Sequence, residues 1–264
     1  MAFTTTSRQY AVVSSEPEKR VPLPVFCAEE WRQPYKHIVF LTGAGISVPS
    51  GLAAFRSEDG LWNNHDADEV ASAIGFKRNP ALVHAFYNRL RPQFQQAEPN
   101  AAHLAIAELQ KRGNAKVTVL TQNIDTLHEK AGTIHVYHIH GVINETVCTF
   151  CGCIIRGWSE KNERSGCPLC YRIGGIRPNI VFFGEPIHFE EKVQNFLADA
   201  DLFIAAGTSG LVSPASHFVS IAKKNGARTL EFNLEPVRNS ADFDGHIFGD
   251  IADTLPYFVK TLSD

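Results

Sequence analysis

The amino-acid sequence predicts an α/β fold built on a doubly wound parallel sheet, with a helical insertion and a small cysteine-rich module. Short continuous apolar runs, typical of buried parallel strands, alternate with segments that carry helix caps. Two long stretches break this alternation, and five of the six cysteines fall between Cys148 and Cys170. A chain of 264 residues with 44% hydrophobic residues can bury one large core and carry a smaller unit beside it. The expected sheet is Rossmann-like.

Four apolar runs are predicted to form the buried strands of this sheet. They cover residues 37–42, 117–121, 202–206 and 228–233. Between them, Asn100 is a suitable N-cap for a helix that Gly113 can end. Likewise, Pro214 is expected at the first position of a helix that ends before Gly226.

The overall composition argues against two classes of partner. The net charge is −3 and the pI is about 6.4, so no global basic surface points to nucleic-acid binding. No apolar run approaches the roughly 20 residues that a bilayer-spanning helix needs. Because the first 36 residues lack a signal-peptide core, we expect a cytoplasmic protein with a loosely structured N-terminal extension. The oligomeric state stays open, and a monomer is compatible with the sequence.

The cysteines are spaced as metal ligands. Cys148 and Cys151 form one Cys-x-x-Cys pair, and Cys167 and Cys170 form a second pair fifteen residues later. This spacing predicts one structural Zn²⁺, because four thiolates leave no open coordination position. Cys153 is left as a spare thiol, since the Cys-x-Cys spacing fits a zinc knuckle less well. A nucleic-acid-binding zinc ribbon is the competing interpretation, and the lack of a basic run disfavours it.

A glycine-rich turn, residues 43–47, comes directly after the first predicted strand. Glycines let the backbone turn tightly and approach a phosphate, which the next amides along the chain can bind. The segment departs from the G-x-G-x-x-G fingerprint because Val48 occupies the third glycine position. Taken alone, the segment fits an ordinary tight turn equally well.

Together with several later segments of the chain, this turn makes the sequence resemble the sirtuin family. The matching segments stand in family order: Gly43-Ala-Gly-Ile-Ser47, Phe55-Arg56, Gly60-Leu-Trp62, Thr121 to His128, His138-Ile-His-Gly141, Pro178 to Glu185, Gly207-Thr-Ser209 and Asn233-Leu-Glu235. The resemblance implies an NAD-dependent protein-lysine deacylase that acts on acyl-lysine proteins. Its products would be nicotinamide and O-acyl-ADP-ribose, with NAD as co-substrate.

The resemblance also implies which residues bind NAD at the switch point of the sheet. Phosphate and ribose contacts are expected from Gly43, Ala44, Gly45 and Ser47, and a loop closing over the cofactor from Phe55, Arg56 and Trp62. The nicotinamide-ribose end would be lined by Gln122, Asn123, Ile124 and Asp125. The remaining contacts would come from Gly207, Thr208, Ser209, Asn233, Leu234 and Glu235.

His140 is the predicted general base, and Asn123 the second catalytic residue. The resemblance implies that the acyl oxygen attacks the ribose as nicotinamide leaves. A base then activates a ribose hydroxyl. Histidine suits this step because its pKa lies near working pH. His138, on the same strand face, is interpreted as an ordinary surface or core histidine.

Residues 179–185 read as a buried strand, and the resemblance implies that this segment also pairs with the substrate peptide. Pairing of that kind works through the main chain and gives little sequence selectivity. Val181 and Phe183 are the side chains expected around the lysine tunnel.

Family members that prefer succinyl and malonyl groups carry a small alanine and a Tyr-x-x-Arg motif. Ala71 and Tyr87 match, but Leu90 stands where the arginine should be. Arg91 returns to nearly the same helix face and is the candidate substitute, although Pro92 after it disfavours helical geometry. The alternative is that Arg89 and Arg91 are both solvated charges at the helix end. We expect deacetylation, with weaker desuccinylase or demalonylase activity.

Two other functions stay open: a mono-ADP-ribosyltransferase of the same fold and a non-catalytic NAD-binding module. The presence of His140, Asn123 and Asp125 favours the deacylase. The predicted organisation is an N-terminal extension (1–36) and a catalytic domain (37–264). Within that domain, 37–55, 99–140 and 181–264 form the Rossmann part, 56–98 the helical insertion and 141–180 the zinc module.

Overall fold

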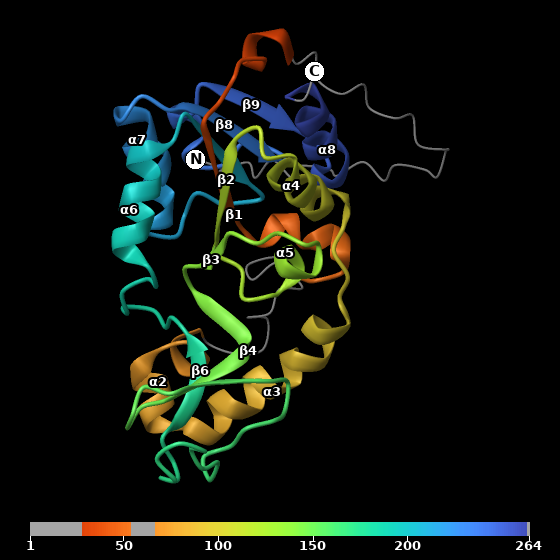
Figure 1. The fold of residues 1–264 in the computed structure, drawn as a ribbon. Helices are drawn as coiled ribbons and strands as arrows, with labels where there is room; N and C mark the ends of the chain where they lie inside the picture. Colours follow the sequence, from red (N-terminus) through yellow and green to blue (C-terminus); the bar gives the residue numbers. More distant parts are fainter. Residues whose placement is uncertain (1–27, 54–66, 263–264) are drawn as a thin grey trace, which may run out of the picture.

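The computed structural model describes residues 28–53 and 67–262 (Figure 1). Its main sheet has six strands in the order β3-β2-β1-β7-β8-β9, and every neighbouring pair is parallel. The strands are β1 (His37–Thr42), β2 (Lys116–Thr121), β3 (Val136–His138), β7 (Leu202–Ala206), β8 (Arg228–Asn233) and β9 (Gly245–Phe248). All four predicted strands are confirmed, while β3 and β9 add one short strand at each edge.

Helices cover both faces of this sheet. They are α4 (Ala101–Arg112) and α8 (Ile251–Thr261) on one face and α6 (Glu190–Asp199) and α7 (Phe218–Lys224) on the other, with the one-turn α5 (Leu127–Lys130) after β2. Strand β1 shows the two-sided packing. Ile38 and Phe40 lie in the hydrophobic cluster with α4 and α8, whereas Val39 and Leu41 lie in the cluster with α6 and α7. The fold is therefore doubly wound, as predicted.

The predicted caps are mostly confirmed. The Asn100 side chain accepts from the Ala102 amide at 3.0 Å, and Gly113 ends α4 in the left-handed region at φ 73°. The prediction for Pro214 is wrong by one position. A short 3₁₀ helix begins at Ala215, after Pro214. The other 3₁₀ helices are Ala28–Trp31, Ala44–Ile46, Val48–Ser50 and Ser240–Asp242.

A small domain lies beside the carboxyl ends of the main strands. It contains α1 (Ala67–Val70), α2 (Ala73–Arg78), α3 (Pro80–Gln96) and an antiparallel sheet of β4 (Gly141–Cys148), β5 (Ile154–Arg156) and β6 (Ile176–Ile180). Val70 and Phe86 from the helices pack with Ile143 and Phe182 from the sheet side in one hydrophobic cluster. The helical insertion and the zinc module thus share a core.

The predicted N-terminal extension is wrong at its last residues. Trp31 and Tyr35 are 4% and 7% exposed and join the main core. Arg228 stacks on the Trp31 ring at 3.8 Å, so this segment is anchored to β8. Among the described residues, no helix is long and apolar enough to cross a bilayer.

Candidate active site

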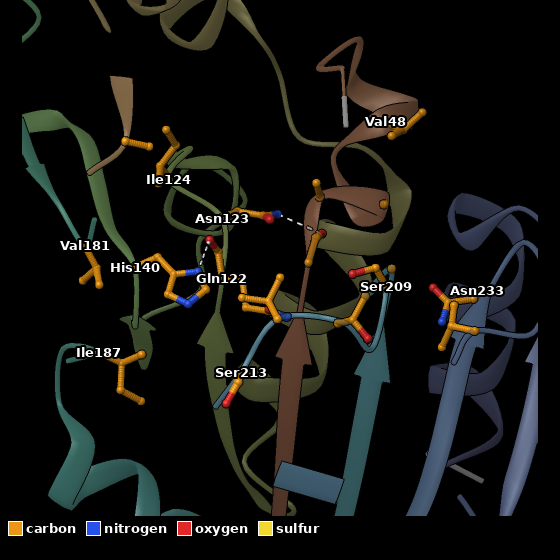
Figure 2. A pocket seen from close by; sticks show the side chains of 18 of the residues that line it. Val48, Gln122, Asn123, Ile124, His140, Val181, Ile187, Ser209, Ser213 and Asn233 are labelled. Atoms are coloured by element: carbon orange, nitrogen blue, oxygen red, sulfur yellow. Dashed lines mark hydrogen bonds between the residues drawn. The ribbon is translucent and has the colours of Figure 1, made fainter. Parts of the chain in front are cut away.

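A cavity of about 560 Å³ opens where the main sheet meets the small domain (Figure 2). It lies at the carboxyl ends of β1 and β7, the two strands at which the chain changes direction across the sheet. Among the predicted site residues, it is lined by Gly43, Ala44, Gly45, Ala71, Tyr87, Gln122, Asn123, Ile124, His140, Val181, Phe183, Gly207, Thr208, Ser209, Asn233, Leu234 and Glu235.

Two glycine turns pack main chain against main chain at the cavity floor. The Gly43 amide donates to Ala206 O at 3.0 Å, and the Gly45 amide donates to Gly207 O at 2.9 Å. A Cβ on Gly43 would lie 2.6 Å from that same Gly207 oxygen, so a side chain has no room. Gly207 itself has φ 66°, and its Cβ would lie 2.3 Å from Ile46 N. This bare backbone fits close approach of a dinucleotide phosphate.

The loop after β2 is braced by a chain of side-chain hydrogen bonds. Asn123 Nδ2 donates to Gly43 O at 3.0 Å and to Ser47 Oγ at 3.1 Å. Ser47 in turn donates to Asp125 Oδ2 at 2.8 Å, and Asp125 Oδ1 accepts from the Leu127 amide at 3.0 Å. Burial raises the pKa of Asp125, and these donors oppose the rise. Ser47 and Asp125 are outside the cavity lining and support Asn123 from behind.

His140 is held in one tautomer at the cavity wall. Its Nδ1 lies 3.1 Å from Gln122 O, and because a carbonyl only accepts, Nδ1 carries the proton. Nε2 is then the basic nitrogen left for the cavity. Burial lowers the pKa of His140, and the neighbouring His188 lowers it further, while the Gln122 hydrogen bond opposes both. A neutral imidazole with a free Nε2 can act as a general base.

Behind Asn233, which lines the far end of the cavity, lies a buried carboxylate that the sequence patterns do not single out. Glu231 is fully buried, and its Oε1 accepts from Asn233 Nδ2 at 2.8 Å. Its Oε2 accepts from His246 Nδ1 at 3.0 Å. The start of α8 also reaches the cavity, where Asp250 caps the Ala252 amide at 2.8 Å. An acidic N-cap before an apolar run was the available signal for α8.

The small domain closes the opposite end of the cavity. The Phe183 amide donates to Ala71 O at 2.8 Å, and the Val181 amide donates to His140 O at 2.9 Å. Tyr87 reaches this end from α3 and is almost fully buried. Burial raises the pKa of Tyr87 far above its ordinary value. The strand predicted over residues 179–185 is wrong for most of its length, because β6 ends at Ile180. The residues after it line the cavity.

Arg91 lies away from the cavity, which corrects its predicted role in the acyl pocket. It is 2% exposed, its Nε donates to Ile143 O at 3.3 Å, and its Nη1 donates to Asn88 Oδ1. The interpretation as a solvated charge is also wrong, because α3 continues through Pro92 to Gln96. At Pro92 the helix loses only the one hydrogen bond that the missing amide would donate. The buried guanidinium of Arg91 donates to acceptors on α3 and β4.

The four predicted zinc ligands converge. All four sulfurs lie within 4.8 Å of one another, and the pairs Cys148–Cys170 and Cys151–Cys167 are each 3.7 Å apart. Thiolates at about 2.3 Å from a tetrahedral zinc would be separated by about 3.8 Å, so the geometry fits one Zn²⁺. None of the four lines the cavity, which fits a structural metal. Cys153 points its sulfur at Ile154 O, 3.8 Å away.

The predicted cofactor-loop residues Phe55, Arg56 and Trp62 lie outside the described residues. Every other predicted cofactor residue lines the cavity or, like Ser47 and Asp125, braces its wall.

Residues 43–214 match the profile of the Sir2 family. The NAD-dependent protein deacylases of Caulobacter vibrioides and Pasteurella multocida are 43% and 45% identical to this chain, covering 85% and 84% of it and 96% of each relative. A solved Sir2 homologue in complex with NAD superimposes with a TM-score of 0.81 at 32% identity, over 89% of this chain and 93% of that one. A Sir2 protein bound to a myristoylated histone peptide gives 0.69 at 34% identity, over 89% and 94%. The cavity geometry and these matches agree, and the chain belongs to the Sir2 family.

Proposed function

We propose that this protein is an NAD-dependent deacylase of protein lysines, with His140 as general base and neutral acyl groups as its preferred substrates. The observation that carries the assignment is the fixed His140 ring in the same cavity as the two glycine turns. The relatives named NAD-dependent protein deacylase support it, as do the solved homologues with NAD and with an acylated peptide.

His140 is positioned to take and return one proton. When bound, NAD supplies the electrophilic ribose carbon and the hydroxyl that accepts the acyl group. The Gln122 carbonyl holds Nδ1–H, so the ring presents Nε2 without having to change tautomer. Because its pKa is lowered, the ring is neutral and ready to accept that proton at neutral pH.

Asn123 is suited to orient the nicotinamide-ribose end. Both hydrogen bonds of its side chain are donated by Nδ2, one to Gly43 O and one to Ser47 Oγ. Oδ1 is therefore the atom available to a ligand, and the braced amide holds it in place. Such prior positioning lowers the cost of reaching the reactive geometry.

The lining segment 181–184 is suited to bind substrate main chain. The Val181 amide is used by His140 O, while its carbonyl has no hydrogen-bond partner in the described part of the chain. A peptide laid along this edge gains main-chain bonds with little dependence on its sequence. Acyl-lysine proteins of varied sequence are the substrates that this geometry accommodates.

The acyl end of the cavity favours a neutral group. Leu90 is buried in the small-domain cluster, and Arg91 is turned toward β4. Burying a carboxylate without a bidentate arginine partner is costly, so succinyl and malonyl groups should bind and react poorly.

A nicotinamide-release assay on matched acetyl-, succinyl- and malonyl-lysine peptides tests the proposal. We expect NAD-dependent turnover with kcat/KM highest for the acetyl peptide. His140→Ala should lower kcat by roughly 100-fold or more while the protein stays folded and still binds NAD. Near-normal deacylation by folded His140→Ala, or a strong succinyl preference of the wild type, would contradict the corresponding half of the proposal.

A cytoplasmic location is part of the same proposal. Its support is that the cysteines are spaced as metal ligands rather than as a disulfide framework, which is typical of proteins in reducing compartments.

A further inference from the structure

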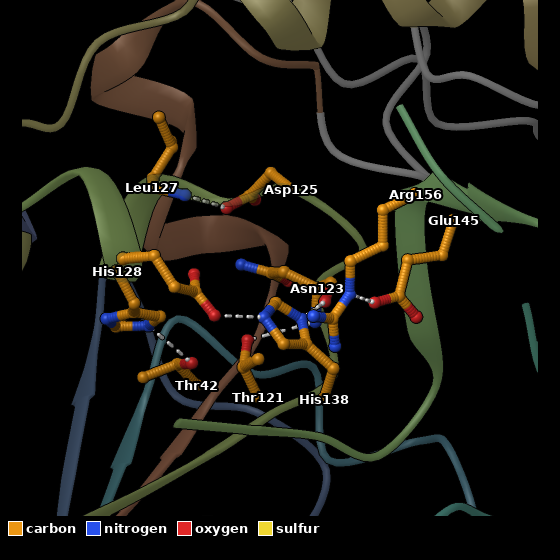
Figure 3. A network of polar contacts seen from close by, with 10 residues as sticks. Thr42, Thr121, Asn123, Asp125, Leu127, His128, His138, Glu145 and Arg156 are labelled. Carbon is orange, nitrogen blue, oxygen red and sulfur yellow. Dashed lines mark hydrogen bonds and ion pairs between the residues drawn. The ribbon is translucent and has the colours of Figure 1, made fainter. Parts of the chain in front are cut away.

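His138 makes two short contacts in a polar network beside the active site (Figure 3). Its Nδ1 lies 3.0 Å from the main-chain oxygen of Asn123, and its Nε2 lies 2.7 Å from Glu129 Oε1. The His138 side chain is 10% exposed, whereas that of Glu129 is 43% exposed. Glu129 and His138 therefore connect the solvent-exposed surface to the main chain of Asn123.

Both ring nitrogens of His138 face acceptors. The Asn123 carbonyl can only accept, so Nδ1 must carry a proton. A carboxylate oxygen of Glu129 accepts at Nε2, so Nε2 must carry a proton as well. The ring is then an imidazolium. Burial by itself lowers the pKa of His138, but the Glu129 hydrogen bond and charge more than offset that, and the pKa is raised.

The contact with Asn123 places this charge where it can act on the catalytic groups. Three consecutive residues, the last of β2 and the first two of the loop after it, make these contacts. The Thr121 hydroxyl accepts from the Asn123 amide at 3.1 Å, the Gln122 carbonyl orients His140, and the Asn123 carbonyl receives His138. A shift of this loop would move the general base and the Asn123 amide together.

We propose that Glu129 and His138 form a charged pair that positions the Gln122–Asn123 loop for catalysis. His138 is a positioning residue, which acts through the main chain of Asn123 and touches neither substrate nor cofactor. This inference rests on the proposed function of the same cavity. It gives a function to His138, which the sequence alone presents as an ordinary surface or core histidine.

Four titratable groups face His138 from the elements packed around it. Glu129 and His128 come from α5, Asp125 from the loop after β2, and His188 from the segment after β6. Burial lowers the pKa of both His128 and His188, so both are neutral around pH 7. Asp125 is hydrogen-bonded to Ser47. Glu129 is thus the direct partner of the His138 charge.

His140 and His138 should therefore limit activity at opposite ends of the pH range. His140 must be neutral, and its pKa is lowered, so activity falls only at acidic pH. His138 must be charged, and its pKa is raised, so the pair is intact below pH 6.5 and is lost as pH rises through the raised value. The alkaline limb of kcat/KM for NAD is assigned to His138.

The test compares Glu129→Gln and His138→Gln with two matched controls. Glu108→Gln removes a carboxylate of similar exposure from a surface ion pair with Arg112, and His135→Gln replaces an exposed histidine. For both test variants we expect kcat/KM for NAD to fall about 10- to 100-fold, with KM for the acyl peptide nearly unchanged. The alkaline limb should move to lower pH in Glu129→Gln and vanish in His138→Gln. Both controls should behave as wild type.

A second measurement is independent of activity. Nitrogen NMR of ¹⁵N-histidine-labelled protein, assigned with His138→Gln, should show His138 doubly protonated at pH 7. A singly protonated ring, or Glu129→Gln behaving like Glu108→Gln, would overturn the proposal. If the wild type releases no nicotinamide, the proposed function fails, and the NMR result still decides the charged pair. If His138→Gln does not fold, Glu129→Gln carries both readouts and also assigns the His138 signal through its shift.

Discussion

The Arg177 guanidinium forms a bidentate ion pair with the Glu185 carboxylate at the acyl end of the cavity. Nη1 donates to Oε1 at 2.7 Å, and Nη2 donates to Oε2 at 2.9 Å. Arg177 also stacks on the Phe182 ring at 4.0 Å, and its charge acts on Tyr87. Burial would raise the pKa of Glu185, but the bonds from Arg177 and from the Phe182 amide lower it. The positive charge of Arg177, beside Tyr87, is therefore already paired with Glu185. Arg177 is not free to bind the carboxylate of an acidic acyl group.

Leu90→Arg should shift the acyl preference toward acids. The new guanidinium stands three residues after Tyr87, where the family motif has its arginine, and can pair with a succinyl carboxylate. We expect the succinyl-to-acetyl ratio of kcat/KM to rise about 10-fold or more, and the free energy of unfolding to fall by about 1–3 kcal/mol because a buried leucine is lost. Leu104→Arg, at an exposed site on α4, is the control. If folded Leu90→Arg has an unchanged succinyl-to-acetyl ratio of kcat/KM, Leu90 is not the cause of the acyl preference.

Gly207→Ala should damage the cofactor site far more than Gly226→Ala. Both glycines have positive φ, 66° and 97°, so both substitutions carry a similar backbone strain. Only the Cβ at Gly207 meets an atom, Ile46 N at 2.3 Å, whereas that at Gly226 meets none within 4 Å. KM for NAD should rise about 10-fold or more in Gly207→Ala and stay within about 2-fold in Gly226→Ala. Equal effects in steady-state kinetics would argue against backbone contact between the two turns.

The zinc site should be required for the small domain, and through it for the cavity. Cys148 ends β4, the strand that pairs with β6 before the lining segment begins. Elemental analysis should give one zinc per chain, and Cys170→Ser should lose it together with a lower unfolding temperature. Cys153→Ser is the matched control, since its thiol lies outside the four-sulfur cluster. Loss of zinc in Cys153→Ser, or its retention in Cys170→Ser, would show that the ligand set is different.

Acid should destabilise the fold through His103. This residue is fully buried, neither ring nitrogen has a partner among the described residues, and burial lowers its pKa from 6.5 to about 4. The unfolded chain therefore binds more protons between these values, so stability present above pH 6.5 is lost as pH falls toward 4. The loss is at most about 3 kcal/mol.

His103→Leu should shrink the difference in urea stability between pH 7 and pH 4.5 by about 1–3 kcal/mol. His128 is also buried neutral and contributes in the same direction, so part of the acid sensitivity should remain. His135→Gln, at an exposed position, should leave the difference unchanged. An identical pH dependence in His103→Leu and wild type would exclude His103 as a source of the acid sensitivity.

Local patterns are sufficient wherever one short segment carries its own signal. The run 37–42 is apolar throughout because β1 is buried on both faces, and the two Cys-x-x-Cys pairs bring their ligands together through two short turns. Strands β3 and β9 are not among the four predicted apolar runs, because they are three and four residues long and only partly buried. The sequence places Trp31 in the extension because its partner, Arg228, is remote along the chain.

By itself, the sequence determined the doubly wound sheet, the zinc ligands and the glycine turns, because these depend on residue type and spacing over a few positions. The general base stays a prediction that the family resemblance supplies. Only the tertiary structure decided which partners the charged side chains have and which of them carry a proton. Arg91 and Arg177 could each have faced the acyl group, and only their packing shows that one binds Ile143 O and the other Glu185. His138 reads as an ordinary histidine until Glu129 and the Asn123 carbonyl are placed on its two nitrogens. A protonation state depends on distance and burial, which spacing along a chain does not specify.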